Sequence, residues 1–181
     1  KKTGQMPLYA HRIVNNFVKA VDFAPFFKNG NGEITTSDDF KKLHIDERYR
    51  LPALAVLNSS LFFWYWRCHG DGFHCGYTDI DEFPLSFDKI SHKNNTVLSS
   101  LAISLSKNLN NTSEIRTRNQ KATGLVKLQT FFVGKSKHII DEIDRVLAEH
   151  YGFTDEELDF IINYDIKYRM GDSLDEGDEE E

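Results

Sequence analysis

The sequence predicts an α+β fold in which a small mixed β-sheet with a buried aromatic helix is followed by C-terminal helices, including a helical hairpin. Three features indicate this class. β-Branched and aromatic residues concentrate in residues 8–36, an apolar run occupies residues 52–67, and helical periodicity dominates after residue 96. With 181 residues and 40% hydrophobic composition, the chain can bury one packed core.

Residues 8–36 predict strands on either side of a tight turn. The turn is Asn29-Gly30-Asn31-Gly32, and both residue types tolerate the positive φ that hairpin turns require. Directly afterwards, Ser37 matches a helix N-cap, with Asp38 and Asp39 in the first turn, where carboxylates are favoured. We therefore expect a short helix over residues 38–44.

The apolar run from Pro52 to about Arg67 predicts one helix that is buried on nearly every side. Pro52 suits a first helical position because its φ is fixed and it has no N–H to satisfy. The consecutive aromatic residues 62–66 point around the whole circumference, so most must lie in the core, with one left to reach the surface and stack on a base. The polar notch Asn58-Ser59-Ser60 is expected to satisfy neighbouring backbone groups.

A glycine-rich loop follows this helix. Gly70, Gly72 and Gly76 break the helix, and residues 80–87 predict a returning strand, with Pro84 at a sheet edge or at the strand end. Loops held between two anchored elements often carry function. The side chains that this loop offers are Arg67, His69, Asp71, His74 and Tyr77.

Helices dominate the rest of the chain. Residues 96–110 and 137–151 each place their apolar residues on one face, and the polar residues 114–124 form a looser connection between them. Gly152 ends the later helix, and Thr154 to Glu157 is a capping box, so a helical hairpin spans about residues 137–165 with its carboxylates directed outward. The outward carboxylates are expected at Asp141, Glu142, Asp144, Glu149, Asp155, Glu156 and Glu157. The predicted organisation is one domain over 1–130, a helical hairpin over 131–170 packed on it and a disordered acidic tail over 171–181.

Charge is distributed unevenly along the chain. Residues 1–130 carry 17 Lys and Arg against 12 Asp and Glu, a net of +5, whereas residues 131–181 carry 5 against 16, a net of −11. Because cations neutralise phosphates and release counterions, a DNA contact is expected in the first part. For any single cation, ordinary surface charge is the competing explanation. The candidate DNA-contacting cations outside the glycine-rich loop are Lys41, Lys42, Arg48, Arg50, Arg116 and Arg118.

The sequence contains no recognisable reaction chemistry. It lacks the glycine-rich loop and the Asn/Asp-Pro-Pro-Tyr/Phe motif of a methyltransferase, a nuclease signature and a phosphate-binding loop. Cys68-His69 and His74-Cys75 have the right ligand types for zinc, but adjacent side chains diverge and the usual ligand spacing is missing, so we predict no metal. An acid–base role for Asp71 beside the two histidines lacks a nucleophile–base pair.

The low cysteine content favours a reducing compartment, and no apolar run is long enough for a membrane span.

Two segments carry a resemblance to a known family. The first is Leu57-Asn-Ser-Ser-Leu-Phe-Phe63 followed by the Asp79-x-x-x-Phe83-Pro84 element, and the second is the helical segment 139–169. In this order, they resemble the C-terminal specificity region of adenine-N6 DNA methyltransferases, and are closest in pattern to the fused restriction–modification enzymes of type IIG. Together they frame residues 54–169, about two-thirds of the chain. The beginning at Lys1-Lys2 is consistent with a piece of a longer protein.

The resemblance implies a sequence-specific DNA recognition domain in the cytoplasm, with no catalytic residues of its own. Its partners would be double-stranded DNA and an N-terminal methyltransferase domain of the same polypeptide. S-adenosylmethionine would bind to that domain, and no cofactor to this part. The parent would then be a site-specific adenine methyltransferase, with or without a fused endonuclease, in which this part reads bases and helps to present the flipped adenine.

Three other functions stay open on sequence grounds. The chain could be a domain of a type I specificity subunit, which would require a second such domain and long spacer helices. It could be a protein-interaction module that docks a partner through its acidic helical hairpin. A metal-dependent nuclease built on the Cys/His loop is the third, and an elemental scan for zinc would test it.

Overall fold

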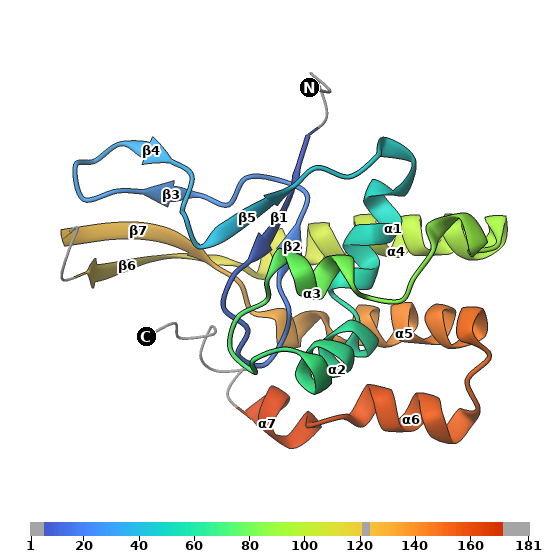
Figure 1. Ribbon diagram of the computed structural model, residues 1–181. Helices are drawn as coiled ribbons and strands as arrows, with labels where there is room; N and C mark the ends of the chain where they lie inside the picture. The colour runs from blue at the N-terminus through green and yellow to red at the C-terminus, as the bar shows by residue number, and fades with distance from the viewer. Residues whose placement is uncertain (1–5, 121–123, 172–181) are drawn as a thin grey trace.

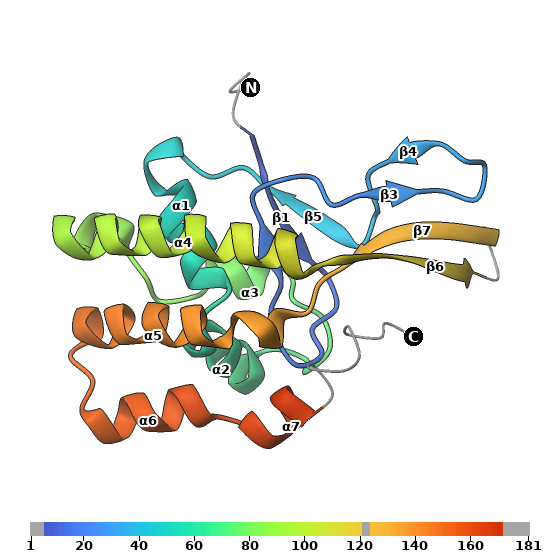
Figure 2. The ribbon, with the colours of Figure 1, turned by 180° about the vertical axis from the view of Figure 1, so that it is seen from behind.

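The computed structural model describes residues 6–120 and 124–171, and it shows the α+β class that the sequence predicts. Helices form one side of the molecule, and a sheet of long hairpins projects from the other (Figures 1 and 2). The strands are β1 (Leu8–His11), β2 (Ala20–Val21), β3 (Phe27–Lys28), β4 (Ile34–Thr35), β5 (Phe40–Leu43), β6 (Glu114–Gln120) and β7 (Gly124–Thr130). The helices are α1 (Glu47–Leu57), α2 (Ser60–His69), α3 (Tyr77–Asp81), η1 (Phe87–Lys89), α4 (His92–Thr112), η2 (Val133–Ser136), α5 (Lys137–Tyr151), α6 (Asp155–Asn163) and α7 (Ile166–Gly171).

The first sheet is antiparallel, with the strand order β2-β1-β5. Its strand β5 replaces the helix expected over residues 38–44, so that prediction is wrong. The Ser37 hydroxyl accepts a hydrogen bond from the Asp39 N–H, which makes a local turn instead of a helix N-cap. Phe40 to Leu43 then pair along the full length of the buried strand β1. Pairing with a distant strand outweighs the local capping signal here.

The second sheet is also antiparallel and has the order β4-β3-β7-β6. The turn predicted at residues 29–32 closes the β3–β4 hairpin, where the Asn29 side chain accepts hydrogen bonds from the N–H groups of Asn31 and Glu33. Residues 114–120, in contrast, are strand β6 and not part of a loose connection. Both faces of this strand carry polar side chains, so the hydrophobic alternation that would have revealed it is absent.

The predicted aromatic helix is two helices. α1 begins after the N-cap Asp46, so Pro52 lies inside it, and the chain breaks at Asn58 before α2. The Asn58 side chain bonds the N–H and the carbonyl of Ala20, and the Ser59 hydroxyl caps α2 by accepting from the Phe62 N–H. The polar notch does satisfy neighbouring backbone groups, as expected, and in doing so it divides the helix.

Residues 80–87 do not form a strand, contrary to the prediction. The Asp79 carboxylate accepts a hydrogen bond from the Gly76 N–H, and this local cap starts the short helix α3. The apolar residues that suggested a strand line a cavity of about 510 Å³ together with side chains of β5, α1 and α2. Alternation of apolar residues can therefore arise from an irregular segment that covers a core.

The helix α5 spans the predicted residues 137–151, whereas α4 extends beyond the predicted 96–110 at both ends. Most of the predicted apolar faces of α4 and α5 are buried, but Val97 is 37% exposed, and α6 begins with the predicted capping box between Thr154 and Glu157. The acidic segment 172–181 lies outside the described residues, so the predicted tail is represented only by Gly171. Among the described residues, no helix has the length and hydropathy needed to cross a bilayer.

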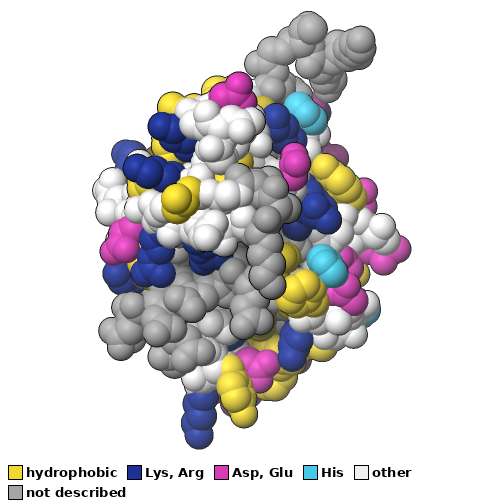
Figure 3. All heavy atoms as spheres, turned by 90° about the vertical axis from the view of Figure 1, so that its left-hand side faces the viewer, with side chains coloured by type: hydrophobic (Ala, Val, Ile, Leu, Met, Phe, Trp, Pro, Cys, Tyr) yellow, Lys and Arg dark blue, Asp and Glu magenta, His cyan; other side chains and the backbone are white. Residues whose placement is uncertain are grey.

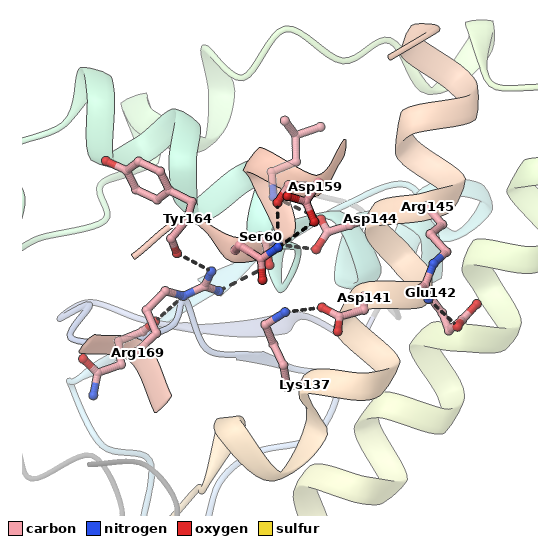
Figure 4. Close-up of polar contacts among 12 residues, drawn as sticks. Ser60, Lys137, Asp141, Glu142, Asp144, Arg145, Asp159, Tyr164 and Arg169 are labelled. Atoms are coloured by element: carbon pink, nitrogen blue, oxygen red, sulfur yellow. Dashed lines mark hydrogen bonds and ion pairs between the residues drawn. The ribbon is translucent and has the colours of Figure 1, made fainter. Parts of the chain in front are cut away.

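One predicted outward carboxylate is buried. Asp144 on α5 is 2% exposed, and its two carboxylate oxygens accept hydrogen bonds of 3.1 Å from the N–H groups of Ser60 and Leu61, at the N-terminus of α2. Burial raises the Asp144 pKa to about 6, because a desolvated carboxylate disfavours its charged form. Figure 4 shows Asp144, Ser60 and Arg169 grouped where α2, α5 and α7 meet. This carboxylate joins α5 to α2, and the expectation that it faces outward was wrong.

Arg169 completes this buried group from α7. It is 1% exposed, and its guanidinium donates to the carbonyls of Asn16 and Tyr164. The guanidinium carbon also lies 4.5 Å from the ring centre of Phe17 and 4.4 Å from that of Phe63. Burial lowers the Arg169 pKa to about 10, and the nearby Asp144 carboxylate opposes this shift. Arg169 therefore joins α7 to the segment that follows β1.

Candidate nucleic-acid interface

An open hollow of about 900 Å³ lies between β5 and the loop that follows α2. It gathers four of the side chains that the sequence singled out, Lys41, Lys42, His74 and Tyr77. Its remaining lining residues are Arg12, Thr36, Ser37, Asp38 and Phe40. Arg12, Lys41 and Lys42 face a single carboxylate, Asp38, so the hollow has an excess of positive charge.

The loop reaches the hollow because it pairs with the segment after β1. The Val14 N–H donates to the Phe73 carbonyl, and the Cys75 N–H donates to the Arg12 carbonyl. From the core side, the indole of Trp66, which is 1% exposed, donates a hydrogen bond of 2.8 Å to the His74 carbonyl. This loop is therefore a rigid wall of the hollow, anchored in the aromatic helix as the sequence suggested.

The polar side chains of the loop serve mainly to hold the loop itself. Asp71 accepts hydrogen bonds from the N–H groups of Phe73 and His74 and pairs with the His74 ring at 2.9 Å. The bond from the His74 N–H is the main cause that lowers the Asp71 pKa to about 2. Arg67 donates to the Gly72 carbonyl, and the His69 ring stacks on Tyr65. These contacts use hydrogen-bonding groups of the loop side chains, so fewer of these groups can bind a ligand than the sequence suggested.

Among the lysines of β5, Lys41 joins the two walls of the hollow. Its ammonium group donates to the Cys75 carbonyl and lies 5.3 Å from the centre of the Tyr77 ring. Lys42 and Arg12 are exposed. Sequence reasoning missed Arg12, because a lone arginine at the end of a strand has no local signal, and only pairing with β5 and the loop places it beside the lysines.

Arg48 and Arg50 lie outside this hollow. Arg48 pairs with Asp46 at the start of α1. Arg50 donates to the carbonyls of Met6 and Asp22, and its side chain is only 11% exposed. These contacts give Arg50 a structural role in joining α1 to the β1–β2 region, and they give Arg48 a role at the helix start.

Arg116 and Arg118 lie on β6, on the same side of that strand. The Arg116 guanidinium lies 5.1 Å from the centre of the Phe132 ring and pairs with Glu114. Arg118 lines a second, smaller hollow whose walls include Ser37 and Phe40, which also line the first hollow. The carboxylate residue Asp39 also lines this smaller hollow, so cations and a carboxylate meet between β5 and β6. Lys and Arg side chains gather on this side of the molecule when it is viewed toward the hairpin ends (Figure 3).

The cysteines sit in different surroundings. Cys68 is exposed, whereas Cys75 is buried, and burial raises the pKa of its thiol to about 12. Within residues 6–120 and 124–171, no three side chains of His, Cys, Asp or Glu group as metal ligands. A thiol held protonated is a poor metal ligand, because metals bind the thiolate.

Replacement of Trp66 by Phe should destabilise the protein by about 1–2 kcal/mol, because the His74 carbonyl loses the donor that the buried indole supplies. Urea unfolding followed by circular dichroism measures this loss. The control is Trp64→Phe on the same helix, since Trp64 is only half-buried and packs edge-on against Phe160. Equal losses for the two variants would show that the indole N–H contributes nothing beyond ring volume.

No family model matches the chain, and neither the curated proteins nor the solved structures contain a significant match to it.

Proposed function

We propose that the chain is a sequence-specific DNA recognition domain of a restriction–modification adenine-N6 DNA methyltransferase. One observation carries the proposal: Arg12, Lys41 and Lys42 line one open hollow, and Arg118 lines a second hollow that shares two wall residues with the first. Cations grouped on one face of a domain are the electrostatic footprint expected of DNA binding. A cytoplasmic location belongs to the same proposal.

The chemistry of the hollow suits a phosphate backbone better than a small substrate. Ammonium and guanidinium groups bind phosphate oxygens without sequence preference, and they fix the register of a protein on a duplex. The phenol of Tyr77 is a further donor for phosphate. Phosphate contacts position the protein, so another element must supply sequence preference.

The rest of the proposed enzyme would lie in a separate methyltransferase domain. S-adenosylmethionine would bind there, since the sequence of this chain lacks both the glycine-rich loop and the Asn/Asp-Pro-Pro-Tyr/Phe motif. This chain would contribute orientation on the duplex and access to the target base, and methyl transfer would take place in the other domain.

The test is duplex DNA binding at two salt concentrations. We expect Arg12→Gln/Lys42→Gln to weaken binding about tenfold at about 50 mM salt, and to reduce the slope of log K against log salt by about 2, because two phosphate contacts are lost. Fluorescence anisotropy with a labelled duplex measures both quantities. Both side chains are exposed, so folding should be unaffected.

The matched control is Lys89→Gln/Lys167→Gln. It removes the same charge from two exposed lysines outside both hollows. An equal loss of affinity in the control would show that net charge, and not this surface, determines binding. Absence of any duplex binding by the unaltered chain would refute the proposed function.

A protein-interaction module is the second candidate, and one observation favours it. α6 presents Asp155, Glu156 and Asp159 on the surface, and the aromatic side chains of Phe160 and Tyr168 are 53% and 78% exposed nearby in sequence. Exposed aromatic residues beside charged ones are typical of protein contact sites. A tight protein partner combined with absence of DNA binding would select this function.

A further inference from the structure

The cavity of about 510 Å³ between β5, α1, α2 and α3 has walls that are mostly apolar. Buried side chains of β5, α1 and α2 form one part of its wall, namely Leu43, Ala53, Val56, Leu57 and Phe62. The irregular segment after α3 adds Phe83, Leu85 and Phe87. A volume of about 300–1,000 Å³ and a lining of mostly apolar side chains are typical of small-molecule sites.

The wall after α3 is held in place by side chains from outside the cavity. The Tyr65 hydroxyl donates a hydrogen bond of 2.8 Å to the Glu82 carbonyl, and the Tyr151 hydroxyl donates one of 3.1 Å to the Pro84 carbonyl. Neither tyrosine lines the cavity. The wall could therefore move inward only if these bonds to α2 and α5 broke, so the space is preformed. Preformed sites are the usual kind for small ligands.

The exposed side chains of the lining mark the mouth of the cavity. They are Lys42, His44, Tyr77 and Asp81. Lys42 and Tyr77 also line the hollow of about 900 Å³, so the two openings adjoin. The two linings together hold three Lys or Arg residues against two carboxylates, Asp38 and Asp81. Within the described residues, the Lys42 ammonium group has no hydrogen-bond or ion-pair partner, so it is available to an anionic group at the mouth.

We propose that this cavity binds a small organic anion. The apolar body of the ligand, a hydrocarbon chain or an aromatic ring system, fills the space between α1 and α3, and its carboxylate contacts the Lys42 ammonium group. An apolar body packs against such walls and is removed from water, which favours binding. Sugars and nucleobases are less suitable, because apolar walls leave their hydroxyl groups and ring edges without hydrogen bonds. This ligand goes beyond the proposed function, because its binding requires no DNA.

Calorimetric titration of the whole chain with decanoate and with naphthoate measures affinity and stoichiometry. We expect at least one of these anions to bind with a single molecule per chain and a dissociation constant of about 100 µM or tighter. Decanoate carries a chain and naphthoate a ring system, so the pair shows which body the cavity takes. Decanol, which has the same chain as decanoate and no charge, tests the contribution of the carboxylate.

Two kinds of variant locate the ligand. Lys42→Gln should weaken binding of the anion about threefold to fivefold and leave decanol binding unchanged, because one exposed charge is lost. Lys89→Gln is the matched control, since it removes the same charge from an exposed residue that does not line the cavity. Ala53→Leu fills the cavity from α1 and should weaken binding of the anion and of decanol at least about tenfold. Ile80→Trp fills the same cavity from α3 and replaces Ala53→Leu if that variant does not fold.

Each alternative outcome overturns a stated part of the inference. If neither anion binds, or if the folded cavity-filling variants bind as tightly as the unaltered chain, the cavity is not the site. If Lys42→Gln and Lys89→Gln have equal effects on the anion, the carboxylate does not lie at Lys42 and the assignment of an anionic ligand fails. Duplex binding is measured separately, so the proposed function can fail while this inference stands, and the reverse.

Discussion

Asp144→Ala should destabilise the protein by about 3–5 kcal/mol at pH 7, the largest effect we expect of any single substitution discussed. The change removes the acceptor for two buried N–H groups, those of Ser60 and Leu61. It also removes the carboxylate that favours the charge of Arg169, which stays buried. Unsatisfied donors and an uncompensated cation each cost free energy in a place that water cannot reach. Urea unfolding measures the difference.

The control for this substitution lies on the same helix. Glu142 is exposed and pairs with Arg145 one turn away, so Glu142→Ala should change stability by no more than about 0.5 kcal/mol. Asp144→Asn, which keeps one acceptor, should fall between the two. A loss below about 1 kcal/mol for Asp144→Ala would mean that α2 finds other partners for its first N–H groups.

Stability should also depend on pH through the same carboxyl group. Burial raises the folded-state pKa of Asp144 to about 6 from an ordinary value of 3.8, against the hydrogen bonds from Leu61 and Ser60, which lower it. The native state therefore holds this proton more tightly than the unfolded chain does. The resulting stabilisation is complete below about pH 4 and is lost as the pH rises through about 6. Two pKa units correspond to about 3 kcal/mol.

Asp144→Asn serves as the reference for this pH effect, because it cannot titrate and leaves the other groups in place. We expect the stability of the unaltered protein relative to this variant to decrease by about 3 kcal/mol between about pH 4 and pH 7. Unfolding curves at several pH values measure the decrease. An increase with pH would show that the hydrogen bonds at the α2 N-terminus outweigh burial.

The sequence by itself determined the features that rest on short-range contacts. The apolar faces of α4 and α5 repeat with the helical period, the capping box of Thr154 and Glu157 lies within one turn, and the hairpin turn at Asn29 is held by its own side chain. Each signal is contained in a few consecutive residues, so no knowledge of distant partners is needed. The α+β class follows from the same local patterns.

Only the tertiary structure decided the features that depend on partners far along the chain. Residues 40–43 are a strand because β1 pairs with them, and the aromatic helix breaks because Asn58 bonds Ala20. Asp144 reaches Ser60 across 84 residues, and Arg12 joins Lys42 only through the packing of β1, β5 and the loop. Apart from proline, local propensities differ by about 1 kcal/mol per residue, whereas strand pairing and buried polar bonds together contribute several. The distant contacts therefore determined both the fold of these segments and the grouping of these cations.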